Sequence, residues 1–371
     1  MKICYVLLSP TFGMHQYTAD LASRLVSEQG REEVEVHLVT TTNFPSDRYS
    51  PAVNVHTPLT TSNTGLSLHS LRLDKLARVK AMLGELQPDL VHFTGPHLWN
   101  VYLMRWLGRW GVPVIHTIHD LDPHAGGAYG RLLRRWNRQV VTAADRVLVH
   151  GETYRQRLVQ QGLPPEKVVS TPLLHLFLSY ERTTCLSQEK EPAVSYEPFA
   201  LFFGRLEPYK GVGTLLAAWS QITTFFEEGE QPQLILAGPG RLGAVWDVDL
   251  PAGVELRNRL IGDEEALDLF RRCSLVVLPY ALATQSALVA AAYYFRKPAL
   301  VTYSGALSEY VEGERTGFVI QPDHPPSLAR ALRAAFADRE RLIEMGNAGR
   351  AWYARERERG TAVLRDLYSI G

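Results

Sequence analysis

Residues 202–211, FFGRLEPYKG, place two cations just past the end of an apolar run. The run FALFF at 199–203 has the length and composition of a buried strand, and Gly204 ends it because glycine lets the backbone turn. Arg205 and Lys210 then lie in a loop that leads into a helical pattern, VGTLLAAWSQI. Arginine binds phosphate oxygens through a fork of N–H groups and lysine acts as a point charge, so the pair could neutralise a diphosphate. Two solvated loop cations are the alternative.

Strand-length apolar runs alternate with longer helical patterns on both sides of this stretch. We expect strands at residues 2–10, 34–41, 53–59, 89–95, 112–120, 146–151, 199–204, 233–238, 253–258, 275–280, 298–303 and 317–322. The alternation predicts βαβ units and an α/β fold with two doubly wound parallel sheets. The polar stretch 179–198 interrupts it and is predicted to be a linker. Ligands of such sheets bind at the carboxyl ends of the strands, so we expect a site in a cleft between two domains.

The composition is that of an ordinary globular protein, with 371 residues, 46% of them hydrophobic, and a formal net charge of zero. A neutral chain has no global field that would attract nucleic acid. The three cysteines, Cys4, Cys185 and Cys273, are widely spaced, which argues against a disulfide framework and fits a reducing compartment. The N-terminus reads as a first strand, and no apolar stretch reaches the length of about 18 residues that a membrane span needs. We therefore expect a cytoplasmic protein.

A glycine-rich segment follows the strand expected at 233–238. Its glycines, Gly238, Gly240 and Gly243, have the GxGxxG spacing of a dinucleotide site. That fingerprint requires a helix to follow at once, whereas AVWDVDLPAG follows here without a helical period. The segment is therefore interpreted as a tight loop beneath a ligand rather than as a nicotinamide site.

Two acidic pairs and a histidine cluster are the candidate metal ligands. DxD pairs at 120–122 and 247–249 have a spacing that holds a divalent metal in some sugar-nucleotide enzymes, although the later pair reads as a surface loop. In the cluster HTIHDLDPH, His116, His119 and His124 are close in sequence. If the segment is a strand, His116 and His119 point to opposite faces, which disfavours the converging ligands of a zinc site. His119 then suits hydrogen bonding or proton handling in the cleft, and His116 suits the core.

A basic helical pattern lies at Arg131–Arg138, RLLRRWNR, with four arginines and a tryptophan. Such a pattern is most often a solvated helix face. The alternative is a contact with an anionic lipid surface, as in peripheral membrane binding, or with a polyanionic acceptor.

The segment ATQSALVAAAYYF, residues 283–295, predicts a buried helix after the strand at 275–280. Thr284 or Ser286 could cap its N-terminus, which would turn free N–H groups toward the cleft. An anion site there, facing Arg205 and Lys210, would form one diphosphate pocket from two loops.

In this order and spacing the segments resemble GT-B glycosyltransferases of family GT4, the retaining group that uses sugar nucleotides. The resemblance covers nearly the whole chain and rests on TFGMHQYTADLASRL, PVIHTIHD, GRLEPYKG, LAGPG, DEEALDLFRRCSLVVLPY, KPALVTYSGALSEYV and TGFVIQP. It implies two Rossmann-like domains facing across a cleft. These would be an acceptor-side domain at 1–178, with a C-terminal helix at 350–371 packing back on it, a linker at 179–198 and a nucleotide-sugar-binding domain at 199–349.

The resemblance also implies roles for single residues. Gly13 would lie near the diphosphate, His119 would face the transferred sugar, and Glu309 would lie near the donor. Arg205 and Lys210 would bind the diphosphate and stabilise its charge as it leaves. No metal or other cofactor is expected, because these cations and a helix N-terminus already supply positive charge.

The chain departs from the family at one place. Most members carry two glutamates eight residues apart, where this chain has Ala283 and Ala291. The loop reads ATQS, which resembles a variant subgroup, and Gln285 and Ser286 become the candidates to contact the donor. A purely structural role for Gln285, as a helix cap, is the alternative.

The resemblance implies retaining transfer of a sugar from a nucleoside-diphosphate sugar to an acceptor hydroxyl by a front-face mechanism, in polysaccharide, glycolipid or glycoside biosynthesis. The missing glutamates leave a catalytically weak sugar-nucleotide-binding protein as an alternative. A GT-B epimerase or phosphorylase is another.

Overall fold

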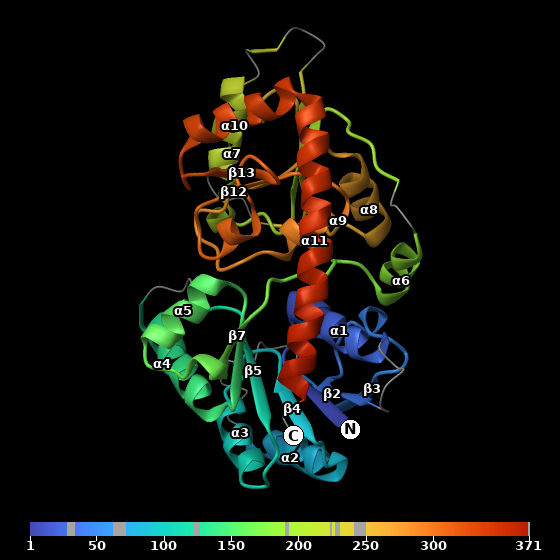
Figure 1. Cartoon of the computed structure of the whole chain (residues 1–371), viewed down its shortest axis with the longest axis vertical. Helices are drawn as coiled ribbons and strands as arrows, with labels where there is room; N and C mark the ends of the chain where they lie inside the picture. The colour runs from blue at the N-terminus through green and yellow to red at the C-terminus, as the bar shows by residue number, and fades with distance from the viewer. Residues whose placement is uncertain are drawn as a thin grey trace. The chain divides into compact units, whose positions relative to one another are not determined.

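The computed structural model describes residues 1–27, 34–61, 72–121, 127–189, 193–222, 225–226, 231–240 and 250–369, and the chain forms two compact units (Figure 1). The first unit comprises Met1–Thr171, His175–Cys185 and Arg359–Gly371. The second comprises Pro172–Leu174 and Leu186–Glu358. Each unit contains one parallel sheet with helices packed against it.

The first unit is built on a seven-stranded parallel sheet with the order β3-β2-β1-β4-β5-β6-β7. Its strands are β1 Lys2–Leu7, β2 Glu35–Thr41, β3 Asn54–Leu59, β4 Leu90–Phe93, β5 Val114–Ile118, β6 Arg146–Val149 and β7 Val168–Ser170. In β1, Ile3–Leu7 are each at most 1% exposed, as expected for a parallel strand that is covered on both faces. The strand order reverses between β1 and β4, where loops diverge and leave room for a ligand.

Helices connect these strands. They are α1 Phe12–Ser27, α2 Leu73–Leu86, α3 Asn100–Gly108, α4 Gly127–Ala143 and α5 Glu152–Gln160. α3 and α4 pack against each other. A further helix, α6 Tyr180–Gln188, passes from the first unit to the second between Cys185 and Leu186.

The second unit is built on a six-stranded parallel sheet with the order β10-β9-β8-β11-β12-β13. Its strands are β8 Phe199–Phe203, β9 Gln233–Ala237, β10 Val254–Arg257, β11 Leu275–Leu278, β12 Ala299–Thr302 and β13 Gly317–Ile320. Its helices are α7 Val212–Ile222, α8 Asp263–Arg272, α9 Ala287–Tyr294 and α10 Pro325–Ala337, with α7 and α10 side by side (Figure 1). The strand order reverses between β8 and β11.

The chain ends in α11 Arg339–Tyr368, a single helix whose last turns, from Arg359 on, belong to the first unit (Figure 1). Charged residues recur along its whole length. In the part of the chain that the structure describes, no helix is both long enough and apolar enough to cross a membrane.

The parallel α/β fold predicted from the sequence is confirmed, and every expected strand range contains a strand. β7 was not predicted, because three residues are too few to show a pattern. The polar stretch 179–198 is not all loop, since it contains α6. Leu186 is the only buried side chain of that helix, so its sequence carries almost no hydrophobic period.

Lys297 is a fully buried lysine just before β12. Its ammonium donates a hydrogen bond to the carbonyl oxygen of Ser195 and lies 4.0 Å from the ring centroid of Tyr196. Burial lowers its pKa to about 8, against the opposing influence of Cys273 and Glu197. Lys297 therefore loses its proton more readily in the folded state than in the unfolded state.

Lys297 should make stability rise with pH. Between pH 8 and the ordinary lysine pKa of 10.5 the unfolded chain binds a proton that the folded chain has lost, so the free energy of unfolding increases with pH. Relative to Lys297→Met, the wild type should gain on the order of 2 kcal/mol between pH 7 and pH 10 in urea titrations. Lys80→Met is the control, because its ammonium also lies over aromatic rings, Tyr102 and Trp106, but is only half-buried. Parallel pH profiles for wild type and Lys297→Met would show that the prediction is wrong.

Candidate active site

Arg205 and Lys210 follow β8, at the point where the strand order of the second sheet reverses. The guanidinium of Arg205 is exposed, and Lys210 is half-buried at the end of a short 3-10 helix, Pro208–Lys210. The Lys210 ammonium donates to the Tyr280 hydroxyl at 3.3 Å and lies 4.9 Å from the centre of that ring. Within the described residues neither cation has a carboxylate partner. Both positive charges are therefore available to an anion.

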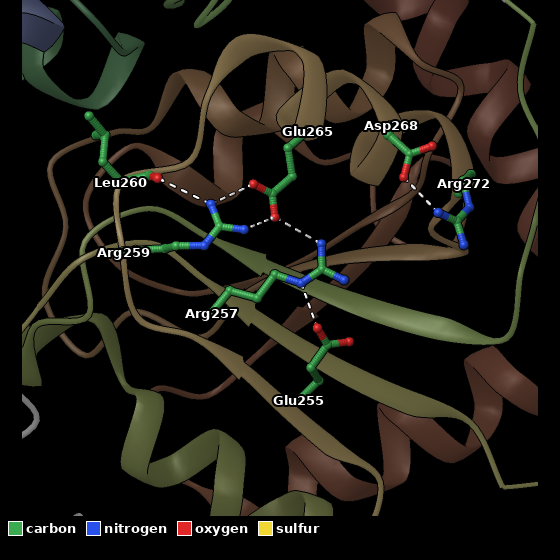
Figure 2. A network of polar contacts seen from close by, with 7 residues as sticks. All are labelled: Glu255, Arg257, Arg259, Leu260, Glu265, Asp268 and Arg272. Atoms are coloured by element: carbon green, nitrogen blue, oxygen red, sulfur yellow. Dashed lines mark hydrogen bonds and ion pairs between the residues drawn. The ribbon is translucent and has the colours of Figure 1, made fainter.

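Neighbouring arginines at the end of β10 are already neutralised (Figure 2). Arg257 contacts Glu255 at 2.6 Å and Glu265 at 3.0 Å, and Arg259 contacts Glu265 at 2.7 Å. Hydrogen bonds from Arg259 and Arg257 lower the pKa of Glu265, so its carboxylate stays ionised. Arg257 and Arg259 thus form a structural network on β10 and α8, which distinguishes them from Arg205.

The loops after β8, β9 and β11 pack backbone against backbone. A Cβ on Gly238, where φ is 144°, would lie 2.2 Å from the carbonyl oxygen of Gly204. A Cβ on Gly240 would lie 2.2 Å from the carbonyl oxygen of Leu206. A Cβ on Gly211, where φ is 69°, would lie 1.9 Å from that of Pro279. The glycine-rich segment is therefore a tight loop, as expected, although Gly243 lies outside the described residues.

The ATQS loop meets the same corner of the second unit. Ser286 caps α9, since its Oγ accepts a hydrogen bond from the Leu288 N–H at 3.3 Å. A Cβ on Gly204 would lie 3.2 Å from the Lys210 Nζ and 3.8 Å from a Leu288 methyl, which places the first turn of α9 beside that lysine. The loop after β8 and the start of α9 are therefore neighbours within this unit.

Gln285 carries an unsatisfied acceptor. Its side chain is half-buried, and its Oε1 atom is buried yet accepts no hydrogen bond from any described residue. Leaving such an oxygen unpaired costs free energy, which a hydroxyl or N–H from a ligand would recover. The cap of α9 is Ser286 and not Gln285, so the purely structural alternative for Gln285 loses its support.

The two alanines at the expected glutamate positions are buried. Ala283 is 7% exposed and Ala291 is 1% exposed. Ala291 lies in α9 among neighbours that are also buried, from Val289 to Tyr294. Neither position presents a polar group, so any hydroxyl of a donor must be bound by other residues.

Glu309 lies in a 3-10 helix, Leu307–Tyr310, that follows β12. It is exposed and lines a pocket of about 490 Å³ together with Tyr303 and Ser308. The described residues that line the pocket all belong to the second unit, and they extend from the segment after β12 to Val319 in β13.

In the first unit, Gly13 and His119 lie at the carboxyl edge of the sheet. Gly13 falls in the first turn of α1 rather than in the preceding loop, with open space where a Cβ would be. His119 directly follows β5, and its Nε2–H donates to the Thr94 carbonyl at 2.9 Å. Burial lowers the pKa of His119, so the neutral ring is favoured and its Nδ1 lone pair remains an acceptor.

Sequence reasoning missed a cluster of groups around His119. The Tyr17 ring lies 5.0 Å from the ring centres of both His119 and His150, and 6.2 Å from that of His175. His150 follows β6 and donates from Nδ1 to the Thr171 carbonyl at 3.1 Å. These histidines are distant in sequence, and only the order of the strands in the sheet brings them together, so no signal within one segment identifies the cluster.

The metal readings receive no support from the described residues, among which no group of three or more histidine, cysteine or acidic side chains could hold an ion. His116 is a core residue, as expected, stacked on Phe93 and accepting from Asn100 at 2.9 Å. His124, Asp122 and the pair at 247–249 lie outside the described residues.

The basic helix at Arg131–Arg138 is part of α4, with its arginines exposed. With α5 it lines a pocket of about 520 Å³ in the first unit, whose rim includes Arg134, Arg138 and Arg157. Among the described residues no acidic side chain lines this pocket, and its lining includes buried residues such as Asn137. Asn137 donates to the carbonyl oxygens of Asp120 and Leu121, next to His119.

Two family descriptions match the chain in succession. Residues 12–173 match a glycosyl transferase 4-like domain, and residues 197–338 match glycosyl transferases group 1. Together the two matches cover most of the chain, and they divide it near the boundary between the two units.

Curated relatives and solved structures agree with these matches. D-inositol 3-phosphate glycosyltransferases from Gordonia bronchialis and Streptomyces scabiei are 26% and 27% identical to the chain, covering 91% of it in each case and 79% and 82% of their own lengths. Sucrose-phosphate synthase from Thermosynechococcus elongatus superposes with a TM-score of 0.74 at 20% identity over 100% of both chains. Anabaena HepE in complex with UDP-glucose superposes with a TM-score of 0.71 at 16% identity, also over 100% of both. The structural likeness shows a shared fold.

Proposed function

The chain belongs to the GT-B glycosyltransferases of family GT4, and on this premise we propose that it moves a sugar, with retention, from a nucleoside-diphosphate sugar to an acceptor hydroxyl. The observation that carries the proposal is the pair Arg205 and Lys210, two cations without carboxylate partners among the described residues, at the strand-order reversal of the second sheet. A doubly wound sheet binds its ligand at this position.

The proposed reaction requires help where charge develops. Negative charge grows on the departing diphosphate as the bond to the sugar breaks, and fixed cations nearby stabilise that charge without reorganising. Arg205 can bind its oxygens with two hydrogen bonds, while Lys210, held by Tyr280, supplies a point charge. Apart from the Leu288 N–H, which Ser286 caps, the N–H groups in the first turn of α9 add partial positive charge on the same side.

The first unit would hold the sugar and the acceptor. The neutral His119 ring, with Nε2–H bound to Thr94, can accept a hydrogen bond from a sugar hydroxyl at Nδ1. Gly13 leaves space for a phosphate to approach the start of α1, and Glu309 of the second unit can accept hydrogen bonds from hydroxyls. No carboxylate is assigned as nucleophile, so the leaving phosphate would take the acceptor proton on the same face.

HepE, which shares the fold, has been crystallised with UDP and with UDP-glucose, and this supports a nucleotide sugar as donor. UDP-glucose is therefore the first donor to assay. The direct test is release of UDP with and without candidate acceptors, together with the anomeric configuration of the product. Release that depends on an acceptor supports transfer, whereas tight UDP binding without release would favour the sugar-nucleotide-binding protein. Conversion of the donor to an epimer would favour the epimerase.

The acceptor is proposed to be anionic. The curated relatives are named for D-inositol 3-phosphate, a phosphorylated polyol. The arginine-rimmed pocket between α4 and α5 offers charge complementary to such a compound or to an anionic membrane surface. We also propose that the protein is cytoplasmic. The Arg131–Arg138 helix would then attach it peripherally to the inner face of the membrane.

Activity should not depend on a divalent metal. Arg205, Lys210 and the start of α9 supply the positive charge that a metal would otherwise bring to the diphosphate. Turnover of UDP-glucose in excess EDTA should equal turnover in buffer alone, and added Mn²⁺ should not raise it. Loss of activity with EDTA and its return with Mn²⁺ would contradict the proposal.

A further inference from the structure

A chain of buried hydrogen bonds joins the C-terminal residue of α11 to Tyr17 within the first unit. The Tyr368 hydroxyl lies 3.0 Å from that of Tyr5 and 2.8 Å from Nδ1 of His92. Nε2 of His92 lies 2.8 Å from the Thr117 hydroxyl, which lies 3.1 Å from that of Tyr17. All five side chains are at most 4% exposed, so water does not substitute for a missing partner.

The protons of this chain must be ordered. Burial holds the pKa of His92 well below its ordinary value, so the ring is neutral and carries one N–H. Each hydroxyl also carries one proton, so donation runs in a single direction along the chain, from Tyr17 toward Tyr5 or the reverse. If the Tyr368 hydroxyl is removed, one nitrogen of His92 loses its partner and the orientation of the Thr117 hydroxyl is no longer fixed.

The end of this hydrogen-bond chain at Tyr17 lies beside the histidine cluster. Tyr17 meets the His119 ring edge-on, at 86°, and the His150 ring at 79°. His119 itself is tied to the sheet by one hydrogen bond, to the Thr94 carbonyl. The Tyr17 ring therefore packs against the imidazole of His119 and restricts its orientation.

We propose that Tyr368, acting through His92, Thr117 and Tyr17, is a positioning residue for His119. This rests on the proposed function, in which Nδ1 of His119 accepts a hydrogen bond from the transferred sugar. The last turn of α11 then helps to orient a sugar-binding group through three intervening side chains, without itself contacting the substrate.

Tyr368→Phe cuts the chain at one end and Thr117→Val cuts it next to Tyr17, while both preserve side-chain volume. Tyr5→Phe is the matched control, because it removes an equally buried hydroxyl but leaves His92 with both partners. The measurements are kcat and KM for UDP-glucose, the pH dependence of kcat, the melting temperature, and the ¹⁵N resonances of the His119 imidazole.

Tyr368→Phe and Thr117→Val should each lower kcat about tenfold, the scale of one lost hydrogen bond, with KM changed less than about threefold. The double variant should be no slower than the slower single variant, because both changes cut one chain. The His119 resonances should shift in both variants and stay unchanged in Tyr5→Phe. A fall in melting temperature with unchanged kcat and unchanged His119 resonances would overturn the proposal, and so would an equal kcat loss in Tyr5→Phe.

The NMR arm separates this proposal from the proposed function. If the wild type transfers no sugar to any acceptor, the transferase proposal fails, but shifted His119 resonances in Tyr368→Phe would still establish the link. If transfer is observed and those resonances do not move, the positioning role alone is excluded.

Discussion

Replacing Arg205 or Lys210 by alanine should lower turnover of the sugar nucleotide by about 10²–10³-fold, the usual cost of removing one fixed group that stabilises developing charge. Stability should change little, because neither cation forms an ion pair within the described part of the chain and Arg205 is exposed. Lys210→Ala loses in addition the contact with Tyr280, so its melting temperature should fall slightly more. The measurements are steady-state kinetics with UDP-glucose and a melting curve for each variant.

Arg259→Ala provides the matched control. Arg259 is also an exposed loop arginine of the second unit, but it binds Glu265 with both terminal nitrogens, at 2.7 and 2.8 Å (Figure 2). Its loss should lower the melting temperature and leave kcat nearly unchanged. If Arg205→Ala and Lys210→Ala both retain near wild-type turnover, or if Arg259→Ala is as slow as they are, the diphosphate site has been assigned to the wrong cations.

The position of Arg205 and Lys210 could be predicted from the sequence because every step was local. An apolar run of strand length, a glycine and a helical pattern place a strand-to-helix loop between 204 and 211, whatever the rest of the fold does. The N-cap of α9 followed in the same way, with Ser286 as one of two candidates. Gly204, Gly211 and Gly238 have positive φ angles where the loops touch. The structure therefore explains why glycine occupies these positions, whereas the sequence shows only that the loops are rich in glycine.

The histidine cluster could not be predicted because it is not local. His119, His150 and His175 meet beside Tyr17 only because β5, β6 and β7 are neighbours in the sheet, and strand order is not written in any one segment. The hydrogen-bond chain to Tyr368 depends on where a helix end docks, 363 residues after Tyr5. Burial of Ala291 likewise depends on how α9 packs, which composition alone does not determine.

Replacing Gln285 should weaken donor binding without lowering stability. The buried Oε1 atom lacks a donor among the described residues, and phosphate oxygens cannot supply one because they only accept. A ribose or sugar hydroxyl can, and neither Ala283 nor Ala291 offers the carboxylate that usually binds those hydroxyls in the family. Gln285 is therefore proposed to replace one lost carboxylate. Gln285→Met, which preserves volume, should weaken UDP binding by about 1–3 kcal/mol, the cost of leaving polar partners unpaired.

Pyrophosphate and Ser286 make this test specific. Pyrophosphate contains no ribose and therefore no ribose hydroxyl groups. Gln285→Met should bind it as tightly as the wild type does, whereas Arg205→Ala should lose affinity for both UDP and pyrophosphate. Ser286→Ala removes the cap of α9 and should lower stability by about 0.5–2 kcal/mol, with a smaller effect on UDP affinity than Gln285→Met. Titration calorimetry with UDP and with pyrophosphate, beside melting curves, measures all of these. If Gln285→Met leaves UDP affinity unchanged, the unpaired oxygen does not bind a ribose hydroxyl. The ribose must then be bound by another part of the second unit, with Glu309 the first candidate because it lines the pocket beside β12 and β13.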